Sequence, residues 1–237
     1  MSSTIRAVLF DLGNTLAAYY HVDEFRPVLE RGIRNVLGEL RHRGRAAPAF
    51  EEALAEALRL NAEARDFRVR PLAERLVRIF GAGVDGDPEL LAAMSARFLD
   101  PVFALGRRYD DSLPVLHHLR AAGIKTGIVS NSPWGSPAAL WRAELRRLEL
   151  FDAVDVTLFC GDVGWRKPAK IVFERAAELI GVPPAHCCFV GDDLAWDVEG
   201  AAHAGMLPIL LDREQRHAAH AATSATDLWG VVERMHR

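Results

Sequence analysis

Acidic residues stand directly after two apolar, β-prone segments of the chain. Asp11 follows residues 8–10, and Asp192 closes a second apolar run that starts at Cys187. A carboxylate in such a place can serve as a nucleophile and form an acyl-phosphate intermediate. Carboxylates that meet in space repel one another unless a cation joins them, and Mg²⁺ prefers oxygen ligands together with substrate phosphate. The two residues therefore predict a magnesium site in which Asp11 is also the nucleophile.

A serine and a lysine follow two other apolar segments. Ser130 and the neighbouring backbone N–H groups can hold a phosphoryl oxygen, and Lys167 can neutralise both the nucleophile and the transferred group. The chain has only three lysines, and Lys167 precedes Pro168 at an expected helix start. A positive charge is unfavourable there unless anions lie nearby, so its placement favours a role in the site.

The apolar pattern of the chain indicates which elements position these residues. Strand-like and helical segments alternate. The predicted strands are 5–12, 124–131, 154–159, 187–192 and 207–212, and the predicted helices are 111–122, 137–149, 168–180 and 198–204. This alternation predicts an α/β fold with a doubly wound parallel sheet. Carboxyl ends of neighbouring parallel strands meet at one edge, so the loops that follow them should form a single site.

Residues 17–105 interrupt this alternation. The segment is rich in alanine, leucine, glutamate and arginine, and residues 50–64 are strongly helical in composition and period. We find no strand signal in it. We therefore expect a helical cap over residues 17–105, inserted into a core made of residues 1–16 and 106–237. A closing helix is expected over residues 226–237.

Composition narrows the classes of function. Half of the 237 residues are apolar and the net charge is only −3, so neither nucleic acid nor a membrane surface is an expected partner. Cys160, Cys187 and Cys188 show no disulfide spacing, which predicts reduced thiols and a cytoplasmic protein. No apolar run approaches the ~20 residues of a membrane helix. A monomer and a homodimer both fit this composition.

The four loops together resemble the motifs of the haloacid dehalogenase-like hydrolase superfamily, in the branch with a helical cap after the first strand. The match rests on the segment around Asp11, on Gly-Ile-Val-Ser-Asn at 127–131, on Arg-Lys-Pro at 166–168, and on 190–192 with the glycine-bearing stretch 200–206. It covers nearly the whole chain. The resemblance implies a Rossmann-like core, a Mg²⁺ cofactor and a small phosphorylated metabolite as the substrate.

The resemblance also implies roles for individual residues. Asp11 would be the nucleophile and a metal ligand, with the Gly13 carbonyl and Asp192 as further ligands. Ser130 and Lys167 would be catalytic beside Asp11, because they hold and neutralise the phosphoryl group. The implied substrate-binding residues are Thr15, Ser130, Asn131 and Lys167, and Asp193 and Asp197 would lie beside the metal ligands.

Gly13 departs from the superfamily pattern. Phosphatases of the superfamily carry a second aspartate at this position, which acts as general acid toward the leaving group and then as base for water. Such help contributes typically ~10²–10⁴-fold, and glycine cannot provide it. Tyr19, Tyr20, His21 and Asp23 follow closely in the sequence. His21 is the best candidate for a substitute, because histidine titrates near neutrality.

Two alternatives to a phosphatase stay open. The 2-haloacid dehalogenase branch also lacks the partner acid, and residues 195–197 resemble the end of its fourth motif. That branch works without metal, however, and has serine where this chain has Asp192. The other alternative is a catalytically weak protein that binds a phosphorylated ligand.

The phosphonate-cleaving branch needs a cap lysine, and residues 17–105 contain none. We therefore expect a Mg²⁺-dependent phosphatase acting through an aspartyl-phosphate on Asp11.

Overall fold

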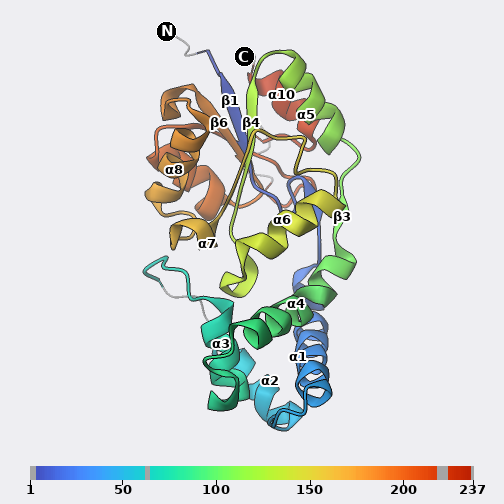
Figure 1. The fold of residues 1–237 in the computed structure, drawn as a ribbon. Coiled ribbons are helices and arrows are strands. Elements are labelled where there is room, and N and C mark those ends of the chain that lie inside the picture. The colour runs from blue at the N-terminus through green and yellow to red at the C-terminus, as the bar shows by residue number, and fades with distance from the viewer. Residues whose placement is uncertain (1–3, 62–64, 218–223, 236–237) are drawn as a thin grey trace.

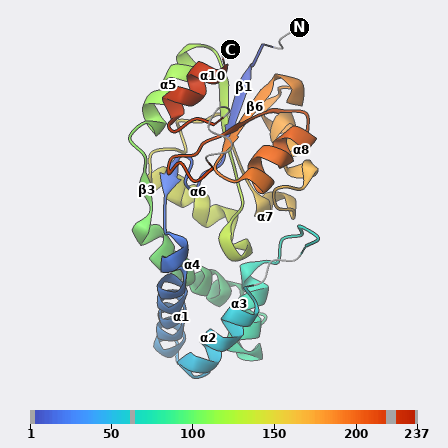
Figure 2. The same ribbon diagram turned by 180° about the vertical axis from the view of Figure 1, so that it is seen from behind.

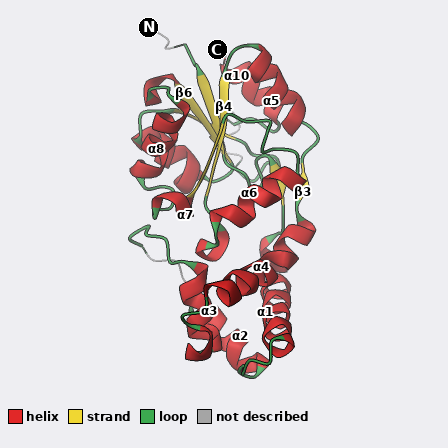
Figure 3. Cartoon of the chain, viewed as in Figure 1, coloured by secondary structure: helices red, strands yellow, loops and turns green. Residues whose placement is uncertain are grey.

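A parallel sheet of five strands forms the centre of the protein in the computed structural model, which describes residues 4–61, 65–217 and 224–235 (Figures 1 and 3). The strands lie in the order β5-β4-β1-β6-β7. They are β1 (Ala7–Phe10), β4 (Lys125–Ser130), β5 (Val156–Phe159), β6 (Cys187–Gly191) and β7 (Leu207–Leu210). The predicted α/β class is confirmed, and each observed strand is shorter than its predicted range.

Helices cover both faces of this sheet (Figures 1 and 2). Successive β1 side chains point to opposite faces, with Val8 and Phe10 in one apolar cluster and Ala7 and Leu9 in the other. All four are fully buried, which explains why this strand is a continuous apolar run. One face packs against α5 (Ser112–Ala121), α6 (Ala138–Arg147) and α10 (Leu228–Met235), and the other against α7 (Cys160–Val163), α8 (Lys170–Ile180) and α9 (Gly200–His203).

One predicted core helix begins too late. The expectation of a helix over 198–204 was wrong at its start, because a π-helix, η5 (Leu194–Glu199), precedes α9. Asp193 starts this turn, and its Oδ1 accepts the N–H groups of Ala195 and Trp196 at 2.8 and 2.7 Å. The other three core helices agree with their predictions within two residues. The closing helix is α10, and residues 236–237 lie outside the described residues.

Four α-helices form an insert over residues 25–105, which we call the helical insert. They are α1 (Phe25–His42), α2 (Phe50–Arg59), α3 (Leu72–Phe80) and α4 (Pro88–Leu105). A Cβ at Gly32 would lie 2.7 Å from the Phe98 carbonyl oxygen, so this glycine lets α1 approach α4 closely. The insert stands beyond the carboxyl edge of the sheet (Figures 1 and 2). The helix predicted over 50–64 ends at Arg59, and residues 62–64 lie outside the described residues.

A short antiparallel ribbon joins the two ends of the helical insert. It pairs β2 (Ala17–Ala18) with β3 (Arg107–Arg108), and Ala17 lies opposite Arg108. The expectation that residues 17–105 hold no strand was therefore wrong. Two alanines are too few to show the alternation by which a strand is recognised. The ribbon forms because the chain leaves and re-enters the core at neighbouring points.

Short 3₁₀ helices lie in the connecting segments. They are η1 (Val22–Glu24), η2 (Ala82–Val84), η3 (Pro133–Gly135) and η4 (Pro184–His186). Within the described ranges, no helix combines the length and the apolar character that crossing a membrane requires.

Candidate active site

The carboxyl edge of the sheet carries a cavity of about 420 Å³. Asp11 comes from the loop after β1, Ser130 from the end of β4, Lys167 from the segment before α8 and Asp192 from the loop after β6. All four line the cavity. The structure thus brings into one place the four residues that the sequence assigned to separate loops.

Lys167 is buried between two carboxylates. Its Nζ donates a hydrogen bond to Asp11 Oδ1 and another to Asp197 Oδ1, each 2.6 Å long. Burial opposes the charge of this ammonium, but the carboxylates of Asp11 and Asp197 outweigh it and hold the pKa of Lys167 above its ordinary value. Lys167 is therefore a fixed positive charge beside Asp11.

Asn131 fixes the main chain of Lys167. Its Oδ1 accepts the N–H of Lys167 at 2.9 Å, and its Nδ2 donates to the Lys167 carbonyl at 3.3 Å. Asn131 also lines the cavity, but both ends of its amide are engaged by the backbone of the lysine. These contacts give Asn131 a positioning role, whereas the sequence placed it among substrate-binding residues.

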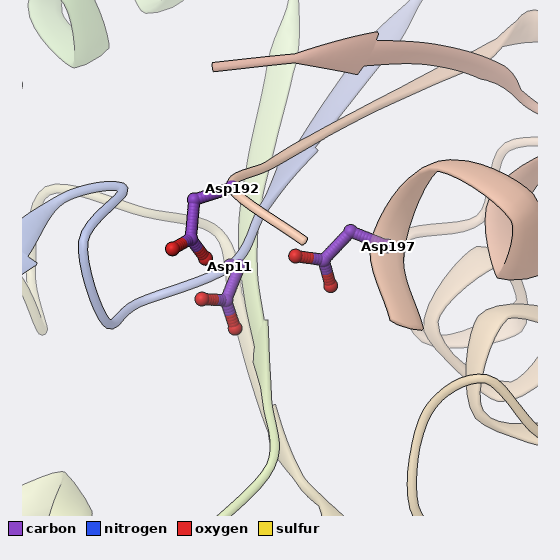
Figure 4. Close-up of side chains that lie close together, drawn as sticks. All are labelled: Asp11, Asp192 and Asp197. Carbon is purple, nitrogen blue, oxygen red and sulfur yellow. The ribbon is translucent and has the colours of Figure 1, made fainter. Parts of the chain in front are cut away.

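Three carboxylates gather at one end of the cavity. Asp11, Asp192 and Asp197 each offer an oxygen, all within 4.8 Å of one another, and the close-up shows the three side chains converging from separate segments (Figure 4). Burial and the negative charge of Asp11 raise the pKa of Asp192 to about 6, although Asn14 Nδ2 donates to its Oδ2 at 3.1 Å. The carboxylates thus repel one another in the absence of a further cation.

This donor set fits a divalent cation. The Oδ1 atoms of Asp11 and Asp197 are held by Lys167, and the cluster still contains Asp192. The charges of Lys167 and of Arg216, whose Nη2 lies 3.6 Å from Asp192 Oδ2, do not outweigh the burial of this carboxyl and the charge of Asp11. Gly13 lines the cavity beside them. Carboxylate and carbonyl oxygens around a space open to substrate are the ligands that Mg²⁺ takes in proteins. Asp11 and Asp192 are the residues that would hold it.

The two remaining acids of the β6 loop differ in their contacts. Asp197 is 2% exposed; burial raises the pKa of its carboxyl, against the opposing charge of Lys167. Its Oδ2 accepts the backbone N–H of Asp193 at 3.2 Å. The carboxylate of Asp193 instead caps the π-helix. Asp197 is therefore a direct partner of the catalytic lysine candidate, whereas Asp193 shapes the loop.

Gly13 and Thr15 of the first loop differ in whether they reach the cavity. Gly13 faces the cavity, and a Cβ there would have no atom of the described chain within 4 Å apart from those of its sequence neighbours. Thr15 is fully buried and is not among the residues that line the cavity. Its carbonyl accepts a hydrogen bond from Arg213 Nη2 at 2.9 Å. This placement agrees with support of the loop, and it does not bring Thr15 to a substrate.

Tyrosines occupy the place where the sequence suggested a histidine. The His21 side chain is 72% exposed, lies 3.8 Å from Glu214 and does not line the cavity. Tyr19 and Tyr20 line it instead, and the Tyr19 hydroxyl is buried without a hydrogen-bond partner among the described residues. Burial, with the negative charge of Glu144, raises the pKa of the Tyr19 phenol. The structure therefore gives no support to His21 as the substitute acid.

Comparison with known proteins identifies the family. The haloacid dehalogenase-like hydrolase model matches residues 5–205. The glyceraldehyde 3-phosphate phosphatase of Methanopyrus kandleri is 31% identical over 215 residues, 88% of this chain and 84% of that protein. An (S)-2-haloacid dehalogenase of a Pseudomonas species is 33% identical over 117 residues, 49% of each chain. A solved 2-haloacid dehalogenase from Pseudomonas syringae pv. Tomato shares the fold, with a TM-score of 0.70 over 99% of both chains at 21% identity.

The chain belongs to the haloacid dehalogenase-like hydrolase family, which confirms the resemblance seen in its motifs, and it is a hydrolase. Its relatives include both phosphatases and dehalogenases. A shared fold does not decide between two reactions, so the choice rests on the residues of the cavity.

Proposed function

We propose that the protein is a Mg²⁺-dependent phosphatase of small phosphorylated metabolites that acts through an aspartyl-phosphate on Asp11. A relative that is 31% identical over 88% of this chain is a glyceraldehyde 3-phosphate phosphatase, which supports this substrate class. The observation that carries the proposal is the hydrogen bond from Lys167 Nζ to Asp11 Oδ1, in a carboxylate that offers an oxygen within 4.8 Å of an oxygen of Asp192.

The residues of the cavity would divide the reaction between them. Lys167 holds Asp11 Oδ1 and presents Oδ2 as the attacking oxygen, and it also offsets the negative charge of the phosphoryl group. Ser130 lines the cavity, and its hydroxyl can turn toward a phosphoryl oxygen. Attack of Asp11 on phosphorus forms the aspartyl-phosphate and breaks the ester P–O bond; the leaving oxygen takes a proton from water and departs as the alcohol. Water then releases phosphate and restores the Asp11 carboxylate.

The metal would be held by Asp11 and Asp192, with the Gly13 carbonyl as a third ligand. When bound, Mg²⁺ supplies positive charge to the phosphoryl oxygens. The cluster of acidic oxygens and the raised pKa of Asp192 support this proposal, because both indicate a place where one more cation lowers the electrostatic repulsion.

A dehalogenase is less consistent with the cavity. A metal-free reaction has no use for the Asp192 carboxylate beside the nucleophile. A 2-haloacid also brings its own carboxylate, which needs a positive partner. Among the described lining residues Lys167 is the only cation, and it already pairs with Asp11 and Asp197, so a haloacid carboxylate would have no other cation, whereas a phosphoryl group would share Lys167 with the metal. The same site gives a phosphate ester both a nucleophile and a place for metal.

We also propose that residues 17–105 act as a cap on a core of residues 1–16 and 106–237. Val102 of α4 lines the cavity together with Tyr19 and Tyr20, which directly follow β2. The β2–β3 ribbon would then be the hinge across which the cap opens and closes.

A cytoplasmic location is proposed as well, since Cys160, Cys187 and Cys188 are all free and buried.

An assay of released phosphate and released halide separates the proposals. Wild-type protein and Asp11→Asn would be incubated with panels of phosphorylated metabolites and 2-haloacids, each with Mg²⁺ or EDTA. We expect phosphate release that requires Mg²⁺ and disappears in Asp11→Asn. Halide release that is indifferent to EDTA would instead establish the dehalogenase. Binding of phosphorylated ligands without turnover would favour the catalytically weak alternative.

A further inference from the structure

The charges that line the cavity are unevenly distributed. Within the described residues, the lining holds four carboxylates and a single ammonium, that of Lys167. The carboxylates belong to Asp11, Asp192, Asp193 and Asp197. Lys167 donates to two of them at 2.6 Å, so it is shared before a substrate enters. If Mg²⁺ and one phosphoryl group bind at this end of the cavity, the positive charges of Mg²⁺ and Lys167 are needed to offset the carboxylates and the phosphoryl group, and none is left for a second anionic group.

The nearest arginines do not supply a second positive site. Arg216 lies 3.6 Å from Asp192 and 3.4 Å from Glu214, and it does not line the cavity. Arg213 is held by both oxygens of Asp111. Each guanidinium therefore already pairs with carboxylates, and neither arginine is among the described lining residues.

Besides Gly13, the uncharged lining includes three polar residues, Asn14, Ser130 and Asn131, of which Asn14 donates to Asp192 and Asn131 holds the Lys167 backbone. The other uncharged lining residues are apolar or aromatic. They are Leu12, Tyr19, Tyr20, Val102, Pro133, Trp141 and Trp196. Tyr19 meets Trp141 edge to face, with ring centroids 5.6 Å apart. Trp196 follows the π-helix start and is 45% exposed, which leaves a large indole surface available to a ligand. Such walls favour contact with apolar or planar groups.

The Tyr19 hydroxyl adds a neutral polar group to these walls. It is buried and has no hydrogen-bond partner among the described residues. Burial and the charge of Glu144 raise the pKa of this phenol, so it stays protonated at neutral pH. It can donate to an oxygen of a ligand, but it cannot compensate a negative charge as a cation would.

We propose that this cavity selects phosphate monoesters whose leaving group is uncharged and largely apolar or aromatic, and that it discriminates against leaving groups with a second anionic group. A carboxylate or second phosphate would be desolvated beside Asp192 and Asp193, where the described lining offers no further cation to pair with it. Specificity of this kind arises from an unpaired charge in the wrong substrate. The inference rests on the proposed phosphatase function and adds its substrate class.

A matched pair of esters tests it. In 4-carbamoylphenyl phosphate and 4-carboxyphenyl phosphate the leaving groups have nearly the same shape, and only the second carries a negative charge. With Mg²⁺, we expect kcat/KM of the wild-type protein to favour the carbamoyl ester by about tenfold or more, the size of the penalty for an unpaired charged group. Free phosphate is measured for both esters.

A second test introduces a positive charge into the cavity wall by mutation. Trp196→Arg places a guanidinium on the cavity wall and should reduce the preference for the carbamoyl ester by about tenfold. Trp229→Arg is the matched control, because Trp229 is 43% exposed, similar to Trp196, but lies on α10 and does not line the cavity. This control should keep the wild-type preference.

The outcomes distinguish the inference from the function on which it rests. Phosphate release from both esters with equal kcat/KM, or with the carboxylate ester preferred, would overturn the substrate class and leave the phosphatase standing. An equal change in both arginine variants would overturn it too, because the charge effect would not be local. Absence of Mg²⁺-dependent phosphate release from these esters and from the metabolite panel would overturn both.

Discussion

The ammonium of Lys167 lies 2.6 Å from Asp11 Oδ1, and the lysine side chain is only 2% exposed. The same nitrogen is 2.6 Å from Asp197 Oδ1, so one charge joins the loop after β1 to the π-helix after β6. Asp11, the proposed nucleophile, is therefore placed and electrostatically compensated by the fold itself. Removing the lysine should affect activity and stability together.

Lys167→Met tests that coupling, because methionine keeps much of the length and loses the charge. Phosphate release should fall to background. The free energy of unfolding should fall by roughly 3–5 kcal/mol, since buried carboxylates lose their partner. Urea denaturation measures the second effect. Lys170→Met is the control: Lys170 pairs with Glu174 at the surface, and both properties should stay close to wild type. Wild-type stability of Lys167→Met would contradict the structural role of the bridge.

Asp192→Asn should stabilise the metal-free protein. The pKa of Asp192 is raised from 3.8 to about 6 in the folded state, so its ionised form costs stability above pH 6, and this cost diminishes as the pH falls toward 4. At pH 7.5 in EDTA, we expect the Tm of Asp192→Asn to exceed that of the wild type by roughly 2–4 °C for each kcal/mol recovered. Thermal unfolding at pH 7.5 and pH 5 measures this, and the difference should be smaller at pH 5.

The same variant should lose its response to Mg²⁺. Mg²⁺ that binds the folded state should raise the wild-type Tm, and the variant lacks one of the two proposed carboxylate ligands. Asp193→Asn is the matched control, because asparagine caps a helix as well as aspartate does and Asp193 lies outside the three-carboxylate cluster. It should retain the wild-type shift. An unchanged Mg²⁺ shift in Asp192→Asn would exclude that residue as a ligand.

Gly13→Asp should raise the turnover number. A Cβ at this position meets no described atom within 4 Å beyond the neighbouring residues, and Gly13 lines the cavity, so a side chain can extend into it. A positioned acid and base contributes typically ~10²–10⁴-fold, and we expect a rise of about tenfold or more in steady-state kcat. Gly13→Asn has nearly the same shape without an exchangeable acid and should give no rise. If both variants show equal rates, proton transfer at this position does not limit the reaction.

Tyr19→Phe separates ligand binding from packing. The Tyr19 hydroxyl is buried without a partner among the described residues, so its removal should leave the protein as stable as before or up to about 1 kcal/mol more stable. If the hydroxyl donates to a substrate, KM should rise while the Tm is kept. Steady-state kinetics and thermal unfolding of the same preparation measure KM and Tm and so distinguish a role in substrate binding from a role in packing. A lower Tm with unchanged KM would assign the hydroxyl to the fold alone.

The convergence of the four loops was predictable because it follows from the order of the chain. Strand and helix alternate in the sequence, and parallel strands bring Asp11, Ser130 and Asp192 to one edge of the sheet whatever the details of packing. The side-chain pattern of β1 also identifies a strand covered on both faces. These features depend on apolar periodicity, which a single sequence displays directly.

The contacts inside the cavity were less accessible to sequence reasoning. The Asp193 cap starts a π-helix that brings Asp197 to Lys167, and no periodicity distinguishes that turn from a helix beginning at 198. The exposed orientation of His21 and the inward position of Tyr19 depend on how the chain leaves the β2–β3 ribbon. A ribbon of two-residue strands leaves too short a signal to be recognised.

Whether Asp11 carries the phosphoryl group can be measured during turnover. Protein, Mg²⁺ and a hydrolysed ester would be mixed and quenched with hydroxylamine, which converts an acyl phosphate into a hydroxamate on the same carboxyl. Peptide mass spectrometry then locates the modification. We predict a hydroxamate at Asp11 in the wild type with Mg²⁺, and none with EDTA or in Asp11→Asn. Mg²⁺-dependent phosphate release that continues in Asp11→Asn, without any hydroxamate at Asp11 in the wild type, would contradict the proposed nucleophile.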